Sequence, residues 1–450
     1  MMCGQGDQIE KRHGTAGEAG WHVSRYLIWT TVPGTQGIAV ANLFRGTCGM
    51  CSPLEWALLA EADDLPCDHP FVTRFVQRGL VVNFDERAAL QTLGRAACAI
   101  PQGVSLTICP TMGCNFDCPY CFSMHHGKKM SLQIQDDVVS LAQRMLDASG
   151  AKGLSVTWFG GEPLLAPRVI ESLSSRLISL VEQRGGTYDA SIITNGYLLT
   201  QEVADMLTAA KVQHAQVTVD GIGAAHDATR RLVDGRPTFD RIVANLQDNK
   251  LGFHVHVRCN VHENNRDEFD DLRAYMERVA HASGNDIACF PALVRDNAAA
   301  DMRGHQVDLV RGADMGDLLV FQRVRHFGPA RGSFCGAHSL WDVGIDEQGR
   351  LHKCWEAVDK PALSFGTARD WDPADPIATA TSPNNLTKFL NTAQPTSDAE
   401  CLDCVWLPLC AGGCPYRRLF ESKACVAYKD DPQTFVRALY AQTHAKKETR

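Results

Sequence analysis

From about residue 104 to residue 290 the sequence alternates short apolar runs with longer amphipathic runs. Six apolar runs predict β-strands, at residues 104–109, 154–159, 190–194, 215–219, 253–258 and 287–290. The segments between them carry apolar residues at the spacing of a helix face. Repeated strand-then-helix units dictate parallel strands joined by right-handed crossovers. The sequence therefore predicts an α/β barrel or an open parallel sheet in this part of the chain.

Local signals also predict where several helices begin and end. We expect helices to begin after Ser131, at Pro167 and after Thr200, because Ser and Thr are favoured N-caps and Pro is favoured in the first turn. Gly150 and Gly185 are expected to end two of them. Asn265 with Glu268 three residues later resembles a capping box for a further helix.

The distinctive polar and glycine-rich motifs all come directly after predicted strands. They are the cysteines Cys114, Cys118 and Cys121, the segment Gly160–Pro163, Asn195-Gly196, Asp220-Gly221, and residues 258–260. In parallel α/β folds the carboxyl ends of the strands form one face, and ligands bind at that face. The sequence therefore predicts one site assembled from these motifs, although Asp220-Gly221 taken alone is more typical of a turn.

The cysteine trio Cys114, Cys118 and Cys121 has a Cys-x3-Cys-x2-Cys spacing. Structural zinc takes four protein ligands, and the common ferredoxin sequences also supply four cysteines to a cluster. Three thiols therefore predict a metal centre with one open coordination position. The alternative is a zinc site completed by His125 or His126.

The segments on either side of this alternating part have a different character. Residues 1–20 are polar and glycine-rich and are expected to be a disordered tail, and residues 21–99 read as a hairpin with helices. After residue 310 the alternation fails and a second group of cysteines begins. It comprises Cys335, Cys354, Cys401, Cys404, Cys410, Cys414 and Cys425. Their paired spacings leave a zinc ribbon open as an alternative to iron–sulfur ligation.

Composition narrows the class of protein. The chain has 18 cysteines and no export signal at its start, so metal or cluster ligation explains them better than disulfides do. A net charge of −8 without a long basic run argues against nucleic acid and against an anionic membrane surface, and no apolar run is long enough to span a membrane. We expect a cytoplasmic protein.

The trio, the aromatic Tyr120 before its last cysteine, and Gly-Gly-Glu-Pro after the next strand together resemble the radical S-adenosylmethionine (SAM) superfamily. The later cysteines, with Gly349 preceding Cys354 by five positions, are similar to the SPASM extension of peptide- and protein-modifying members. The resemblance implies a partial (β/α)6 barrel at residues 100–310 and a SPASM domain at residues 311–450. Residues 21–99 resemble a winged-helix-like module that recognises a leader peptide.

The same resemblance implies three [4Fe–4S] clusters and S-adenosylmethionine. Cys114, Cys118 and Cys121 would hold the first cluster, and Gly160, Gly161, Glu162 and Pro163 would meet the methionine amino group. Thr218, Asp220 and Arg258 sit where related enzymes touch the ribose or carboxylate. One auxiliary cluster would be held by Cys401, Cys404, Cys410 and Cys425. The other would be held by Cys335, Cys354 and Cys414 with an open site, because residues 335–341 lack the fourth cysteine of some members.

The function that the resemblance implies is hydrogen abstraction by a 5′-deoxyadenosyl radical, followed by oxidative crosslinking of a ribosomally made peptide. A Cys-to-carbon thioether is the first choice. Carbon–carbon crosslinking and anaerobic sulfatase maturation, which forms formylglycine, are the catalytic alternatives. An iron–sulfur electron carrier and a zinc-binding interaction protein are the non-catalytic ones. Expected partners are a precursor peptide with a leader and a low-potential electron donor such as flavodoxin or ferredoxin.

Other conspicuous residues have simpler interpretations. His254 and His256 share one face of a predicted strand and are expected to be structural. We expect ordinary reduced thiols at Cys48 and Cys51, and Lys128-Lys129 is expected to lie in a solvated loop. The same reduced state is expected for Cys3, Cys67, Cys98, Cys109, Cys259 and Cys289.

Overall fold

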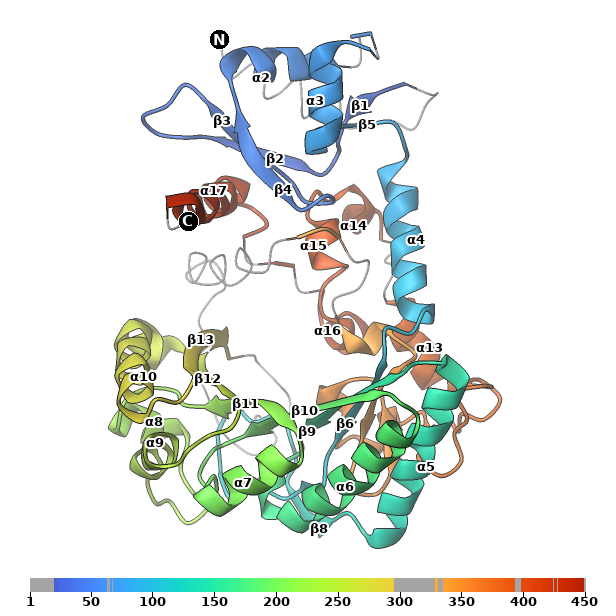
Figure 1. Cartoon of the computed structure of the whole chain (residues 1–450), viewed down its shortest axis with the longest axis vertical. Helices are drawn as coiled ribbons and strands as arrows, with labels where there is room; N and C mark the ends of the chain where they lie inside the picture. Colours follow the sequence, from blue (N-terminus) through green and yellow to red (C-terminus); the bar gives the residue numbers. More distant parts are fainter. Residues whose placement is uncertain are drawn as a thin grey trace. The chain divides into compact units, whose positions relative to one another are not determined.

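The computed structural model of the chain (Figure 1) describes residues 20–62, 65–66, 68–294, 328–330, 335–392, 398–423, 425–426 and 428–448. These fall into two compact units. One unit comprises residues 100–312 and 336–390, and the other joins residues 1–99 to 313–335 and 391–450. The tail predicted before Gly20, the boundary predicted at residue 310, and two of the cysteines, Cys3 and Cys67, lie outside the described residues. The predicted domain limits remain predictions.

The first unit contains the predicted parallel sheet. Its neighbouring strands, in spatial order, are β13 (Ile287–Leu293), β12 (His254–Val261), β11 (Val212–Thr218), β10 (Thr187–Thr194), β9 (Gly153–Trp158) and β6 (Val104–Ile108). Each pairs with the next in parallel, which confirms the six predicted strands and the α/β class.

Three further strands extend this sheet beyond β6. β14 (Asp342–Ile345) pairs with β6 in parallel, and β15 (Arg350–His352) and β16 (Gly366–Thr367) follow in antiparallel order. These three strands lie in the cysteine-rich part of the sequence, where no strand is predicted. Strands of two to four residues leave too short a pattern for period-two alternation to reveal them.

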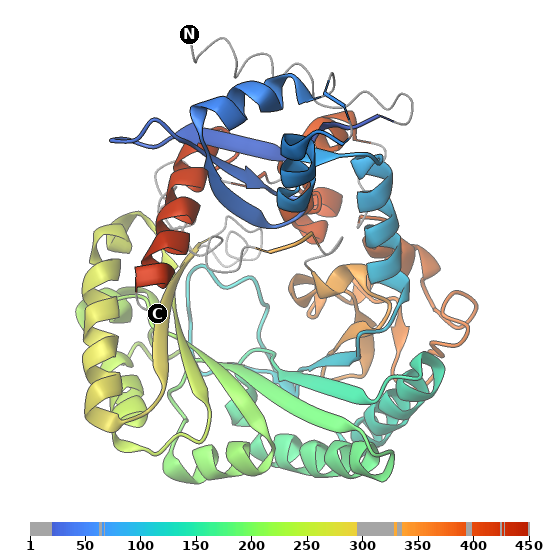
Figure 2. The same ribbon diagram turned by 45° about the horizontal axis from the view of Figure 1, so that its top comes forward.

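Helices cover the outer face of the curved sheet, as Figure 2 shows. They are α5 (Leu132–Ser149), α6 (Pro167–Gln183), α7 (Gln201–Ala209), α8 (Ala224–Thr229), α9 (Phe239–Asp248) and α10 (Phe269–Ser283). The predicted starts of α5, α6 and α7 are confirmed, as are the ends of α5 and α6 next to Gly150 and Gly185. Ser131 and Thr200 accept hydrogen bonds from first-turn amides, Pro167 begins α6, and Gly150 ends α5 in a left-handed conformation.

Two local predictions are wrong. Asn265 does not cap a helix with Glu268, because a 3-10 helix, η3 (Glu263–Glu268), comes first and α10 begins at Phe269. The Asn265 side chain instead accepts the amide N–H of His262. Lys128 and Lys129 are exposed, as expected, but they belong to a short strand, β8 (His126–Lys129), rather than to a loop. β8 pairs with β7 (Thr111–Met112).

The second unit begins with a three-stranded antiparallel sheet in the order β2 (Leu27–Thr31), β3 (Ile38–Asn42), β4 (Thr47–Cys51). The helices α2 (Pro53–Ala60) and α3 (Pro70–Arg78) and the strand β5 (Val81–Val82), which pairs with β1 (His22–Val23), confirm the predicted hairpin with helices. β4 and the helix α4 (Glu86–Ala99) were not predicted from the sequence. β4 reads Thr-Cys-Gly-Met-Cys, which is poor in β-branched and aromatic residues.

Both faces of this small sheet are buried. Leu27, Ile38 and Val40 pack with Trp56 and Phe75 of α2 and α3. On the opposite face, Ile28, Ala39 and Ala41 belong to a core that includes Trp406, Tyr428 and Phe435. Phe435 lies on α17 (Pro432–Glu448), which packs against β2, β3 and β4. The N-terminal sheet and the C-terminal helix therefore share one hydrophobic core.

Among the helices that the structure describes, none is both long and apolar enough to cross a membrane. Cys48, Cys51, Cys109, Cys259 and Cys289 form no disulfides in the structure, and their reduced state remains a prediction. Burial raises the pKa of Cys48 to about 11, so it is a weak nucleophile at neutral pH.

We predict that Phe435→Ala destabilises the N-terminal sheet. Phe435 is fully buried, and truncating a buried Phe to Ala costs about 3–5 kcal/mol. Limited proteolysis should show faster cleavage within residues 21–99, although these residues lie far from position 435 in sequence. Gln433→Ala, at an exposed position of the same helix, is the control and should leave the cleavage rate unchanged. Equal cleavage of both variants would contradict a shared core.

Candidate functional site

The cysteine trio lies in the loop between β7 and β8, at the carboxyl end of β6. Cys118 is buried, and Cys114 and Cys121 are half-buried. The Phe116 N–H donates to Cys114 Sγ over 3.4 Å. Burial raises the pKa of Cys114, and the charges of Glu162, Cys118 and Cys121 act in the same direction. The three thiols thus form one partly enclosed group of soft sulfur donors, which suits iron–sulfur ligation.

His125, one of the two candidate zinc ligands, lies beside this group. Its Nε2 is 3.5 Å from Cys121 Sγ. Nowhere in the described residues do three His, Cys, Asp or Glu side chains converge in a geometry already set for a metal ion. The zinc alternative therefore gains one neighbour of the trio, and the absence of a preset geometry holds equally for the trio as iron–sulfur ligands.

Gly160-Gly161-Glu162 packs directly against the start of the cysteine loop. Gly161 N–H donates to Thr111 O over 3.2 Å, and Glu162 N–H donates to Gly113 O over 2.8 Å. A Cβ atom on Gly161 would lie 2.3 Å from Gly113 O, and one on Gly160 would lie 2.2 Å from Thr111 O. Glycine is required here because the two backbones approach too closely for any side chain.

The Glu162 carboxylate is buried at the ends of β9 and β10. Its Oε1 accepts hydrogen bonds from Leu164 N–H at 2.9 Å and Thr194 Oγ1 at 2.7 Å. Its Oε2 accepts from Asn195 N–H at 2.7 Å. Burial raises the pKa of Glu162, and these hydrogen bonds oppose the rise. Glu162 therefore fixes the strand ends that carry the motif, and its contact with the methionine amino group remains a prediction.

The middle of the cysteine loop is held by the segment after α8. Val233 N–H donates to Asn115 O at 3.0 Å, and Asp117 N–H donates to Arg231 O at 3.1 Å. The Asn115 side-chain oxygen accepts from Asn195 Nδ2 at 2.8 Å. Asn195 follows β10, so a second predicted strand-end motif also contacts the loop.

Tyr120 anchors the end of the loop in a buried polar network. Its hydroxyl group donates to Asp220 Oδ2, and it accepts from Arg230 Nη1 at 2.8 Å and Asn260 Nδ2 at 3.1 Å. Asp220 Oδ1 accepts from Asn260 N–H at 2.9 Å. Burial raises the pKa of Asp220, and the facing Arg230 guanidinium opposes that rise. Asp220 is therefore a member of the site rather than only a turn residue.

Arg230 and Asn265 also belong to this network, although neither was predicted to be part of the site. Arg230 is buried, with its guanidinium 5.4 Å from the Phe116 ring centroid. Asn265 Nδ2 donates to Asp220 O at 2.6 Å and to Asn260 O at 3.0 Å. Arg230 does not follow a strand, and Asn265, which lies four positions after β12, resembled a helix cap, so neither was identified as part of the site.

Thr218 and Arg258, the other two predicted cofactor contacts, are neighbours across β11 and β12. Thr218 is buried, and Arg258 Nε donates to Asn260 Oδ1 at 2.8 Å. The structure thus brings Thr218, Asp220 and Arg258 to the same edge as the cysteine loop. Their contacts with a ribose or carboxylate remain predictions.

His254 and His256 lie near the amino end of β12, away from this edge. His254 Nδ1 pairs with Asp286 Oδ2 at 2.5 Å, and its ring stacks on His214 with 5.4 Å between centroids. These contacts suit the structural role expected for them.

The second cysteine group belongs largely to the other compact unit. Cys401 lies on α14 (Ala399–Asp403), Cys404 follows it, and Cys410 ends α15 (Leu407–Cys410). Burial raises the pKa of Cys410 to about 11, and the thiols of Cys404, Cys401 and Cys425 add to the rise. Cys410 therefore lies within electrostatic range of each of the other three thiols. The other predicted set, Cys335, Cys354 and Cys414, draws on both units and remains a prediction.

Curated relatives match different lengths of the chain. A GTP 3′,8-cyclase of Microcystis aeruginosa is 27% identical over 29% of this chain and 35% of its own length. This chain therefore spans about a third of the length of such relatives. A PqqA peptide cyclase of Methylorubrum populi is 26% identical over 60% of this chain and 71% of its own length. A cysteine-type anaerobic sulfatase-maturating enzyme of Clostridium perfringens is 25% identical over 73% and 95%.

Two solved structures share the fold. anSMEcpe with bound AdoMet and the Cp18Cys peptide has a TM-score of 0.56 and 19% identity, covering 77% of this chain and 100% of that one. Streptococcus suis SuiB bound to precursor peptide SuiA has a TM-score of 0.50 and 14% identity, covering 91% and 99%. Residues 108–276, which contain the cysteine trio and all the strand-end motifs, match the model of the radical SAM superfamily. Residues 108–276 of this chain therefore form a radical SAM region, and the fold over most of the chain is similar to these two solved structures.

Proposed function

We propose that this enzyme is a peptide maturase that installs an oxidative crosslink, a Cys-to-carbon thioether, in a ribosomally made peptide. The observation that carries the proposal is the extent of the likeness to SuiB, whose structure holds a precursor peptide and covers 91% of this chain. That likeness reaches well beyond the radical SAM region at residues 108–276. The match of residues 108–276 to the radical SAM superfamily favours an enzyme over an iron–sulfur electron carrier or a zinc-binding interaction protein.

Cys114, Cys118 and Cys121 are proposed to hold the first [4Fe–4S] cluster. When bound, the cluster and S-adenosylmethionine supply a carbon radical that abstracts a hydrogen atom. The chain's own residues position and enclose the site. Gly160 and Gly161 let the β9 end reach the cysteine loop, and Tyr120 fixes the far end of that loop. We propose that Thr218, Asp220 and Arg258 line the cofactor side of this edge.

Two auxiliary clusters complete the proposed set of cofactors. Cys401, Cys404, Cys410 and Cys425 form a full set of four thiolates, and their interaction supports a common site. Cys335, Cys354 and Cys414 would leave one iron open, because residues 335–341 carry no further cysteine. An open iron suits a substrate thiolate, which is why we place thioether formation first.

We propose that the N-terminal sheet recognises the leader of the substrate by adding it as a further strand. β2 and β4 are the edge strands. Arg78 covers the β4 edge, since its Nη2 donates to Met50 O at 2.8 Å and its carbonyl oxygen accepts from Thr47 Oγ1 at 2.9 Å. β2 is therefore the better place for a peptide. A cytoplasmic flavodoxin or ferredoxin is the proposed electron donor.

Sulfatase maturation is a second candidate function. It is favoured by the match to nearly the whole length of the C. perfringens sulfatase-maturating enzyme. The product distinguishes the two functions, because formylglycine carries an aldehyde and a thioether does not.

We predict that replacing Cys114, Cys118 and Cys121 together with Ala abolishes cleavage of S-adenosylmethionine. The measurement is 5′-deoxyadenosine after anaerobic reconstitution and reduction, with an expected loss of at least about a hundredfold because the open iron is gone. Iron should fall from about twelve to about eight atoms per chain, four for each cluster. Persistent 5′-deoxyadenosine would contradict the site, and about four irons in the unaltered enzyme would remove both auxiliary clusters from the proposal.

We also predict that Gly161→Ala impairs the first cluster whereas Gly127→Ala does not. The added Cβ at position 161 would overlap Gly113 O, which forces the cysteine loop to move, whereas nothing lies within 4 Å of a Cβ at Gly127. The readouts in Gly161→Ala are 5′-deoxyadenosine, expected to drop about tenfold or more, and iron content, expected to fall by up to about four atoms per chain. Equal loss in both variants would show that the close approach does not shape the site.

The proposed reaction is tested by coexpression with a short peptide encoded beside the gene, followed by mass spectrometry. A thioether should appear as loss of two hydrogens together with a cysteine that no longer reacts with iodoacetamide. The same peptide without its leader should remain unmodified. Loss of two hydrogens with a reactive cysteine would replace the thioether with a carbon–carbon link. A product that reacts with hydroxylamine as an aldehyde would favour the formylglycine reaction.

A further inference from the structure

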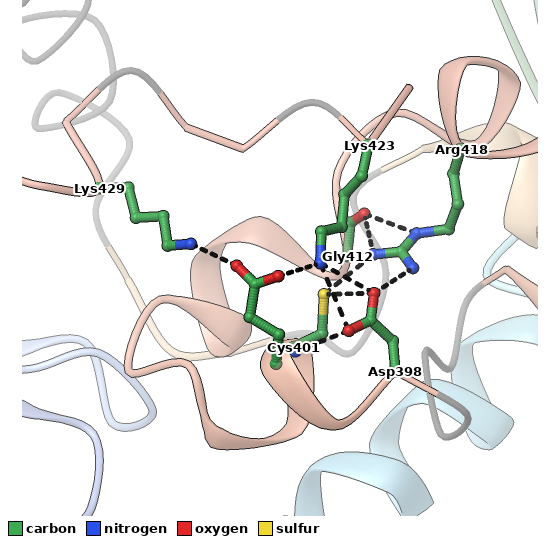
Figure 3. Close-up of polar contacts among 7 residues, drawn as sticks. Asp398, Cys401, Gly412, Arg418, Lys423 and Lys429 are labelled. Atoms are coloured by element: carbon green, nitrogen blue, oxygen red, sulfur yellow. Dashed lines mark hydrogen bonds and ion pairs between the residues drawn. The ribbon is translucent and has the colours of Figure 1, made fainter. Parts of the chain in front are cut away.

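Cys401, a proposed auxiliary-cluster ligand, is contacted by an arginine (Figure 3). Arg418 Nη2 donates to Cys401 Sγ over 3.0 Å. Arg418 lies on α16 (Pro415–Phe420), 17 positions after the cysteine. Only 17% of its side chain is exposed, so water screens this contact weakly.

Other contacts hold the Arg418 guanidinium in place. Its Nη1 donates to Asp398 Oδ2 at 3.0 Å, and its Nε and Nη2 donate to Gly412 O at 2.9 and 2.8 Å. Gly412 and its neighbour Gly413 are both left-handed, which turns the chain sharply between α15 and α16. Because the Arg418 guanidinium is held on several sides, little side-chain entropy remains to be lost when it contacts the Cys401 sulfur.

Two lysines and one more carboxylate surround this core of contacts, as Figure 3 shows. Lys423 pairs with Asp398 at 3.0 Å and with Glu400 at 2.7 Å, and Lys429 pairs with Glu400 at 2.6 Å. Asp398 also accepts the Cys401 N–H at 3.1 Å. The five charged side chains carry one net positive charge, and the cation nearest to the sulfur is Arg418.

We propose that Arg418 raises the reduction potential of the iron–sulfur cluster held by Cys401, Cys404, Cys410 and Cys425. The inference rests on the proposed function, which assigns these cysteines to a cluster. Reduction adds one negative charge to a cluster, and a cationic N–H donor at a ligand sulfur stabilises the reduced form more than the oxidised form. Hydrogen bonds to cluster sulfurs are a recognised means of setting the potential.

A raised potential fits the electron balance of the proposed crosslink. Joining a cysteine sulfur to a carbon removes two hydrogens from the peptide. One leaves as the hydrogen atom abstracted by the radical, and the other leaves as a proton and an electron. An oxidised iron–sulfur cluster can accept this second electron, and a higher potential makes that transfer more favourable. Arg418 is thus a positioning residue for electron removal and does not touch the peptide.

The adjacent residue provides a matched control. Arg417 lies on the same helix but pairs with Glu421 at 3.0 Å, and about a third of its side chain is exposed. Arg417→Gln and Arg418→Gln therefore remove the same charge from neighbouring positions, and only the second removes the donor to Cys401 Sγ. Arg418→Lys keeps the charge but cannot reproduce the planar fork.

The test is a redox titration followed by electron paramagnetic resonance, using the full chain with Cys114, Cys118 and Cys121 replaced by Ala. The signal of this cluster is the one that disappears when Cys404→Ala is added. We expect Arg418→Gln to lower its midpoint potential by at least the 59 mV that corresponds to a tenfold change in a one-electron equilibrium. Arg417→Gln should leave the midpoint potential unchanged. The potential of Arg418→Lys should lie between that of the unaltered chain and that of Arg418→Gln.

Each outcome bears on the proposal. If Arg418→Gln selectively loses about four irons, that loss would support the contact, but no potential could be measured in this variant. The potential would then be measured in Arg418→Lys, where it should still be lower than in the unaltered chain. Equal potentials and equal iron in Arg417→Gln and Arg418→Gln would overturn the proposal. That result would leave the peptide reaction untouched, because mass spectrometry measures crosslinking independently. Absence of any signal sensitive to Cys404→Ala would instead remove the cluster itself.

Discussion

The close contact between residues 160–162 and residues 111–113 is the constraint on which the site depends. Two backbones meet there without an intervening side chain, joined by hydrogen bonds from Gly161 and Glu162. The buried Glu162 carboxylate then ties the same segment to the end of β10 through Thr194 and Asn195. A loop that carries three metal ligands would otherwise have to be ordered when the metal binds, at a cost of about 1–2 kcal/mol per residue. Because the strand ends already order the loop when the chain folds, much less conformational entropy is lost when the metal binds.

The far end of the loop is fixed by a different kind of interaction. Tyr120, Asp220 and Arg230 form a buried network in which the carboxylate and the guanidinium both contact the phenol oxygen. Buried charges are costly unless their partners satisfy them, and removing one partner from such a network is strongly destabilising. The network therefore permits one arrangement of the loop relative to β11 and β12. The cysteine loop is therefore fixed at both ends. The glycine contact at residues 160–162 holds its start, and the network of Tyr120, Asp220 and Arg230 holds its end.

These attachments also explain which features could be predicted from the sequence. Strands of five to eight residues and helices with Ser, Thr, Pro or Gly at their ends carry strong local signals, so the parallel sheet and its strand-end motifs were predicted correctly. β4 has a single β-branched residue, Thr47, and β14 to β16 are too short to show a period. Asn265 resembled a helix cap because its amide does accept a backbone N–H, but that group belongs to His262. Arg230 depends on contacts distant in sequence, which no local pattern encodes.

The shared core of the second unit links two parts of the proposed function. Trp406 lies between Cys404 and Cys410 in sequence, and its ring is 4.8 Å from that of Tyr428 and 5.1 Å from that of Phe435. The same core contains Ile28 of β2 and Ala39 of β3. The sheet proposed to bind the leader and the helices that carry the auxiliary cysteines therefore fold as one body. Removing residues 1–95 would uncover this core and disturb the cysteines as well, so substitutions at single positions separate leader binding from cluster binding better than truncation does.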